Sequence, residues 1–171
     1  FSVLKSTFIK LLIGFIQPDK GDISITCNKS LNDYDFIDLI SYVPQSVYIF
    51  DDTILENILL GLEYNHENLT KVLNVSCLTD LISDLPEGIN TKIGDRGSQL
   101  SGGQCQRIAI ARALYRDKKI LILDEATNGL DAITEETLMK NIVNQYKDVT
   151  LLKISHKMEF LSNVNEIIDL S

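Results

Sequence analysis

The run Ile120-Leu121-Ile122-Leu123-Asp124-Glu125 joins four apolar residues to two adjacent carboxylates. A continuous apolar run of this length is typical of a strand that is buried on both faces, as in a parallel sheet covered by helices. In such sheets, ligands bind beyond the carboxyl ends of the strands. The run therefore predicts a buried strand, with Asp124 and Glu125 at the edge of the sheet where a ligand site is expected.

The residue types at this strand end suit a reaction that needs a metal ion and water. Mg²⁺ prefers oxygen ligands, so Asp124 is expected to position the metal. Glu125 is expected to orient and polarise the attacking water as a general base. The alternative is a solvated strand end that caps the next helix, and two carboxylates alone do not exclude it.

Strand and helix patterns alternate on both sides of this run. Apolar residues at helical spacing predict helices over residues 5–16, 53–81, 101–114 and 133–146. Other patterns predict strands over residues 21–27, 39–44 and 149–154, a short helical stretch near Phe160 and a last element at 166–170. This order favours a parallel sheet with crossover helices, with a helical block inserted between two α/β pieces.

A second motif, Leu100-Ser101-Gly102-Gly103-Gln104, lies at the start of the predicted helix 101–114. Adjacent glycines let backbone amides approach an anion closely, and a helix start adds unpaired N–H groups and the positive end of a dipole. These features predict a phosphate site. The alternative is a plain glycine turn that Ser101 caps.

Composition limits the class of protein. The chain has 171 residues, 44% of them apolar, which is the size and composition of one globular domain. A formal net charge of -8 argues against a nucleic-acid partner, because such proteins carry a basic excess. The cysteines Cys27, Cys77 and Cys105 are far apart, which indicates free thiols in the reducing cytosol.

Membrane and secretion signals are not apparent in the sequence. The longest apolar stretch, residues 11–16, is far shorter than the roughly 20 residues that a membrane-spanning helix needs. The first residue is Phe1 and no secretory signal follows it, so we expect the chain to be a fragment of a longer one.

Together the two motifs resemble the nucleotide-binding domain of ATP-binding-cassette proteins. Asp124 follows Ser101 by 124 − 101 = 23 residues, and the matching elements occur in the order of the family. The other matches are a glutamine loop at Gln45, a loop at Asn128-Gly129-Leu130-Asp131 that crosses the dimer interface, and a switch histidine at His156. The resemblance covers nearly the whole chain.

The resemblance implies an α/β fold with the core of a P-loop NTPase (RecA-like) and a mostly parallel sheet. The core would comprise residues 1–45 and 117–171, incomplete at both ends, and residues 46–116 would form an inserted α-helical subdomain that carries the signature. ATP and Mg²⁺ would be the cofactors. The reaction would be ATP hydrolysis by positioning and charge neutralisation.

The resemblance also assigns roles to residues. Two domains would sandwich ATP head to tail, with the signature of one contacting the γ-phosphate that the other binds. His156 would hold the same phosphate, Gln45 would sense the metal and water, and Asp131 would tie the two sites together. The nucleotide-binding signature residues would be Ser101, Gly102, Gly103 and Gln104.

The phosphate-binding loop departs from the family pattern Gly-x-x-x-x-Gly-Lys-Ser/Thr. Only Lys5-Ser6-Thr7 is intact, and Leu4 stands where the last glycine belongs. Lys5 would contact the β- and γ-phosphates, Ser6 the metal and Thr7 the phosphate chain. Either the loop is altered, or residues are absent between a strand at residues 1–3 and Lys5.

Two further segments are similar to exporters. Residues 49–58 match the segment after the glutamine loop, and residues 94–97 match a loop that touches the membrane helices. These features imply a transmembrane domain fused upstream and a place at the cytoplasmic face of the cell membrane. The alternatives are a degenerate nucleotide-binding module with a regulatory or structural role, and a soluble family member acting in DNA repair or translation.

Overall fold

The computed structural model describes residues 2–21, 37–94, 99–155 and 165–168, and the side chains of residues 2–4 and 6 are outside that description. In these residues the strands β1 (Ile40–Val43), β2 (Ile120–Asp124) and β3 (Thr150–Ile154) form one parallel sheet in the order β1-β2-β3. Val43 pairs with Leu123, and Asp124 pairs with Ile154. The predicted parallel sheet and its buried strand are therefore confirmed.

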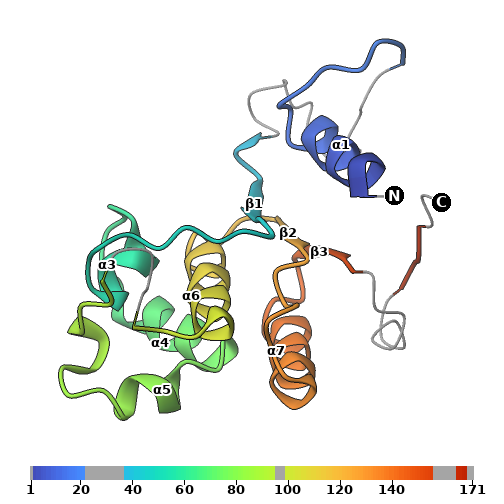
Figure 1. Cartoon of the computed structure of the whole chain (residues 1–171). Helices are drawn as coiled ribbons and strands as arrows, with labels where there is room; N and C mark the ends of the chain where they lie inside the picture. The colour runs from blue at the N-terminus through green and yellow to red at the C-terminus, as the bar shows by residue number, and fades with distance from the viewer. Residues whose placement is uncertain (1, 22–36, 95–98, 156–164, 169–171) are drawn as a thin grey trace.

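Alternate side chains of β2 enter two different cores, as the two-residue period of a strand requires. Ile122 packs with Ile9, which lies in the helix α1 (Ser2–Leu12), and with Ile13, which directly follows this helix. Leu121 and Leu123 belong to the larger core on the opposite face, to which α6 (Gly102–Tyr115) and α7 (Ala132–Gln145) contribute. Figure 1 shows α1 on one side of the sheet and these two helices on the other.

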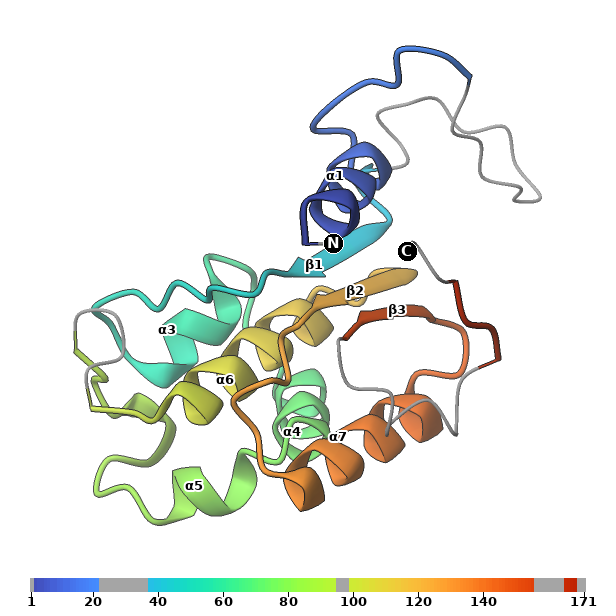
Figure 2. The same cartoon turned by 45° about the vertical axis from the view of Figure 1, so that its right-hand side comes forward.

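The middle of the chain is helical but divided into short pieces, seen at the left of Figure 2. They are α3 (Ile54–Leu59), α4 (His66–Val75), α5 (Thr79–Ser83) and the 3-10 helix η1 (Gly88–Asn90). Thr53 caps α3 by accepting a hydrogen bond from the amide of Glu56, and Leu60 ends it at a φ of 45°. Asn65 caps α4 in turn, so the predicted helical block over residues 53–81 holds separate helices.

Arg112 joins α6 to the segments around it. Its Nε donates to the carbonyl of Asn57 at 2.7 Å, and its Nη1 donates to the carbonyl of Tyr48 at 3.0 Å. Asn57 is fully buried and its side chain accepts from the amide of Phe50 at 2.9 Å. Burial lowers the pKa of the Arg112 guanidinium, which still carries its charge at neutral pH. This network fixes the chain that follows β1 against α3 and α6.

The first helix differs from its prediction at both ends. It begins at Ser2, so the strand expected at residues 1–3 is wrong for Ser2 and Val3, which are helical. It ends at Leu12 rather than residue 16, because Gly14 takes a φ of 75° and turns the chain. Val3, Leu4 and Lys5 are consecutive residues of this helix.

Other expectations fall partly outside the description. The strand predicted over residues 21–27 is described only at Gly21, and the helical stretch near Phe160 lies outside the described residues. Residues 166–168 are described and form neither helix nor strand, so no element is observed there. None of the described helices has the length and apolar character to cross a bilayer.

Candidate functional site

Glu125 follows β2 in a left-handed backbone conformation, with a φ of 50°. This conformation is uncommon for a residue with a Cβ and persists only where the surroundings hold it. Here the Glu125 amide donates to the carbonyl of Ile154 at 3.1 Å, and the Glu125 carbonyl accepts from the amide of Asn128 at 3.1 Å. The strand end and the next turn therefore hold the residue that the sequence assigns as general base.

Two side-chain amides contact the Glu125 carboxylate. Gln45 Nε2 and Asn128 Nδ2 each donate to Glu125 Oε2 at 2.9 Å. Gln45 comes from the segment after β1, so adjacent parallel strands bring two predicted site residues together although they lie far apart in the sequence. Asn128 was predicted as part of the loop that crosses the dimer interface, and its contact with Glu125 was not predicted.

Asp124 has a partner on the neighbouring strand. Tyr42 Oη donates to Asp124 Oδ2 at 2.9 Å. Burial, followed by the hydrogen bond and the charge of Asp124, raises the pKa of Tyr42 to about 12. Tyr42 is therefore a neutral hydrogen-bond donor at physiological pH and orients the carboxylate that was assigned to the metal. No pattern in the sequence indicates this contact.

The donor chemistry at this edge fits Mg²⁺. The Tyr42 hydroxyl contacts only one of the two carboxylate oxygens of Asp124. Because Gln45 donates through its Nε2, its Oε1 is left as an acceptor on the same side chain. In the described part of the chain no group of three or more His, Cys, Asp or Glu could hold a metal ion.

Ser101 begins α6 with a reciprocal cap. Its hydroxyl accepts from the amide of Gln104 at 3.2 Å, and the Gln104 side chain accepts from the amide of Ser101 at 2.7 Å. This capping box confirms the predicted helix start. The helix begins at Gly102, so the amides of the first turn point outward from its N-terminus.

Gly103 lies directly against the loop that follows Glu125. A Cβ on Gly103 would come within 2.7 Å of the carbonyl oxygen of Gly129, so only glycine fits without a shift. The Gly129 amide donates to Gln106 Oε1 at 2.9 Å. The first two turns of the signature helix thus contact the predicted dimer-interface loop of the same chain.

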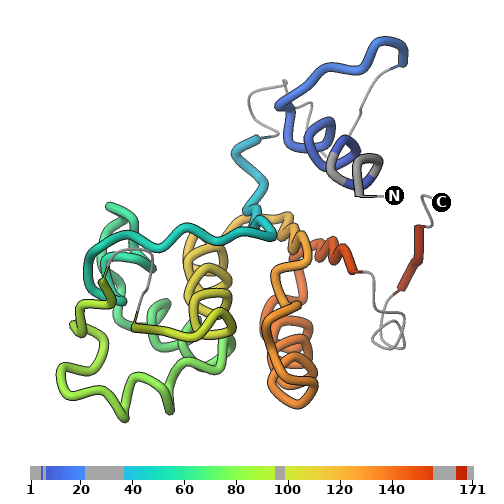
Figure 3. Tube along the Cα trace, viewed as in Figure 1, coloured from blue at the N-terminus to red at the C-terminus, as the bar shows by residue number. Residues whose placement is uncertain are grey.

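Asp131 caps α7 and is exposed to solvent. The amide and hydroxyl of Thr134 donate to its two carboxylate oxygens at 2.9 and 2.7 Å. These two hydrogen bonds lower the pKa of Asp131, the side-chain one most strongly. Asp131 is therefore a fixed negative charge, and the trace in Figure 3 follows the chain from β2 through residues 125–131 into this helix.

The remaining predicted residues lie in α1 or outside the description. Lys5 Nζ donates to the carbonyl of Ser155 at 3.4 Å, which brings α1 to the end of β3. Thr7 is exposed, and the side chain of Ser6 is outside the described residues. His156 follows Ser155 but is itself not among the described residues.

Comparisons with known proteins support the reading of these motifs. The family model described as ABC transporter matches residues 5–128. The chain is similar to the ATP-dependent permease MDL1 of Candida albicans, with 44% identity over 96% of this chain and 25% of that protein. It is 39% identical to an ATP-dependent lipid A-core flippase of Ralstonia nicotianae, over 96% of this chain and 29% of the flippase.

A solved structure of a member of the ABC transporter family also matches this chain. The structure of a bacterial Atm1-family ABC exporter with ATP bound superimposes with a TM-score of 0.84 at 33% identity, covering 93% of this chain and 28% of the exporter chain. The chain thus spans about a quarter of the length of these relatives. Nothing in the comparisons favours a degenerate module. The chain belongs to the ABC transporter family, as a nucleotide-binding domain of the exporter type.

Proposed function

We propose that this chain binds ATP with Mg²⁺, hydrolyses it, and thereby powers export by a transporter of which it is the ATPase domain. The observation that carries the proposal is the Glu125 carboxylate at the end of β2, held by Gln45 next to Asp124. The sequence identity of this chain to a permease and a flippase supports the link to transport.

The proposed hydrolysis uses the groups at the carboxyl edge of the sheet. Bound Mg²⁺ would supply positive charge to the phosphates, held by Asp124, the Ser6 hydroxyl and Gln45 Oε1. Glu125 would accept the proton of the attacking water. Lys5 would contact the β- and γ-phosphates, and the Thr7 hydroxyl the phosphate chain.

The proposal includes a second copy of the domain. The first amides of α6 would meet the γ-phosphate bound by the partner domain, because a helix N-terminus favours an anion. His156 would hold the same phosphate, and Asp131 would join the two sites. The residues of the signature that contact nucleotide would be Ser101, Gly102, Gly103 and Gln104.

The proposed assembly follows the division of the chain expected from its sequence. Residues 1–45 and 117–171 would form the ATP-binding core and residues 46–116 the signature subdomain. The other partner would be the transmembrane domain of the transporter, so the chain would lie at the cytoplasmic face of the membrane. Support for this arrangement comes from the relatives, whose names describe permeases and flippases.

Phosphate release from Mg²⁺-ATP tests the proposal. Glu125→Gln keeps the shape of the side chain but removes the base, so we expect ATP binding to persist and turnover to stop. Glu136→Gln is the matched control, because Glu136 is an exposed residue of α7 that pairs only with Lys140. Unchanged turnover in Glu125→Gln would refute Glu125 as the base, and no turnover in the unaltered chain would refute the ATPase proposal.

A further inference from the structure

The loop from residue 126 to residue 130 connects the proposed general base to the cap of α7. Asn128 contacts the Glu125 carbonyl through its amide at 3.1 Å and the carboxylate through its side chain at 2.9 Å. The amide of Leu130 donates to the carbonyl of Thr127 at 3.1 Å, which makes the loop compact. A displacement of this loop would therefore move Glu125 at one end and Asp131 at the other.

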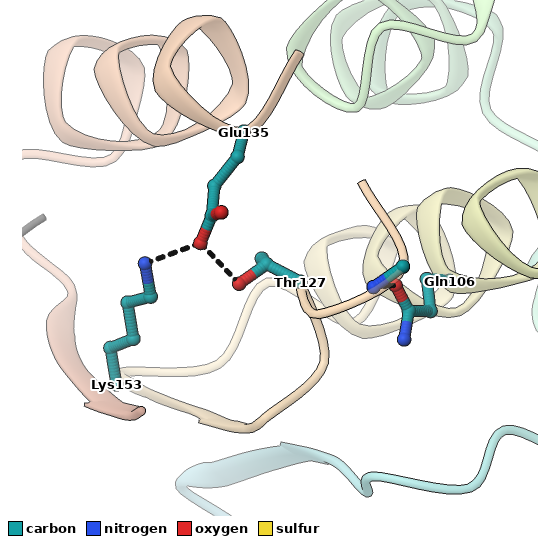
Figure 4. A network of polar contacts seen from close by, with 5 residues as sticks. Gln106, Thr127, Glu135 and Lys153 are labelled. Carbon is teal, nitrogen blue, oxygen red and sulfur yellow. Dashed lines mark hydrogen bonds and ion pairs between the residues drawn. The ribbon is translucent and has the colours of Figure 1, made fainter. Parts of the chain in front are cut away.

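A buried ion pair holds the loop on the side of the sheet. Thr127 Oγ1 donates to Glu135 Oε1 at 2.6 Å, and Lys153 Nζ donates to the same oxygen at 2.7 Å. Figure 4 shows these side chains converging from the loop, from α7 and from β3. One carboxylate oxygen thus joins the loop to two elements of the core.

The burial of this group suggests more than a contribution to stability. Thr127 and Glu135 are each 2% exposed, and the side chain of Lys153 is 9% exposed. A buried ion pair gives little net stability compared with apolar residues, because both charges lose their hydration. Its hydrogen bonds are directional, however, and they fix the groups that they join.

The signature helix holds the loop from the other side. Gln106 Oε1 accepts from the amide of Gly129 at 2.9 Å, and Gly103 packs against the backbone of Gly129. The loop is therefore fastened at Thr127 to the core and at Gly129 to α6. These two attachment points, Thr127 and Gly129, directly flank Asn128, which contacts Glu125.

We propose, on the basis of the ATP hydrolysis proposed above, that Thr127, Glu135, Lys153 and Gln106 are positioning residues for Glu125. They hold the loop so that Asn128 keeps the Glu125 carboxylate in place for the reaction. The loop position accordingly affects the chemical step.

The test compares three variants of the whole chain in Mg²⁺-ATP hydrolysis. Thr127→Val removes the hydroxyl while nearly keeping the shape of the side chain. Thr127→Ser keeps the hydroxyl and removes only the methyl group. Thr137→Val is the matched control, because the Thr137 hydroxyl is exposed and donates to the Ile133 carbonyl within α7. Since a hydrogen bond to a charged group is lost, we expect kcat of Thr127→Val to fall by about tenfold with KM unchanged. Thr127→Ser and Thr137→Val should keep most of the activity.

Hydrogen exchange of the amides of residues 126–131 is the second readout, and it needs no activity. Thr127→Val should exchange these amides faster than Thr127→Ser and Thr137→Val do. Equal kcat in Thr127→Val and the unaltered chain, or equal loss in Thr127→Ser, overturns the inference. If the unaltered chain releases no phosphate, the proposed function fails. In that case, if Thr127→Val does not change the exchange rates of these amides, the inference is overturned as well.

Discussion

At the scale of single residues, the carboxylate of Glu135 depends on one cation. Lys153→Met would leave that carboxylate buried without a counter-charge, which costs about 3–5 kcal/mol in the free energy of unfolding. The double variant Lys153→Met/Glu135→Gln removes both charges and should recover much of the loss. Urea unfolding followed by circular dichroism measures the difference.

The control for this prediction is the ion pair of Lys140 and Glu136. Their side chains are 60% and 58% exposed, so Lys140→Met should cost less than about 1 kcal/mol. Equal losses in Lys153→Met and Lys140→Met would contradict the assignment of Lys153 as the partner of a buried charge.

The hydroxyls of two tyrosines should lose their protons at a higher pH than an ordinary tyrosine does. Burial raises the pKa of both Tyr42 and Tyr146 to about 12, from an ordinary value of 10.0. Between these pH values the unfolded chain releases protons that the folded chain retains, so the free energy of unfolding falls as the pH rises through this window. Tyrosinate absorbance should show a late phase that the Tyr42→Phe/Tyr146→Phe variant lacks. A single phase near the ordinary value in the folded protein would argue against the burial of both hydroxyls.

The sequence predicted the charged groups of the site but not their hydrogen-bond partners. Asp124 and Glu125 stand out because carboxylates follow a fully apolar strand. Tyr42 and Asn128 carry no such signal, since a tyrosine in a strand and an asparagine in a turn are common. Their contacts depend on the register of β1 against β2 and on the backbone turn at Glu125, which no local pattern shows.

At the scale of elements, the start of α6 needs a glycine at residue 103 but not at residue 102. A Cβ at Gly103 would meet the Gly129 carbonyl at 2.7 Å, whereas nothing lies within 4 Å of a Cβ at Gly102. Gly103→Ala should therefore destabilise the fold by about 1–3 kcal/mol through overpacking. Gly102→Ala should be neutral or stabilising by up to about 1 kcal/mol, because alanine favours the helix. Thermal unfolding of the two variants compares the positions, and a greater loss for Gly102→Ala would contradict this packing.

Element boundaries followed the sequence closely where a local signal marks them. Ser101 and Asp131 cap the helices that were predicted after them, and β2 coincides with the apolar run. The first helix begins at Ser2, before the helical apolar spacing that starts at residue 5. The division of residues 53–81 into separate helices rests on the left-handed turn at Leu60, which apolar spacing does not reveal.

At the scale of the whole molecule, two copies of the chain should close on ATP when hydrolysis is blocked. In the proposed dimer each ATP touches the signature of one copy and the Glu125 side chain of the other. Glu125→Gln removes a negative charge next to the γ-phosphate and prevents the turnover that separates the copies. We therefore expect this variant with Mg²⁺-ATP to have twice the mass of the single chain in light scattering, and the same variant with ADP to remain single. Glu136→Gln, whose ATP is consumed, should not accumulate the dimer. A Glu125→Gln chain that binds ATP but stays single at saturating nucleotide would refute the head-to-tail arrangement without refuting ATP binding.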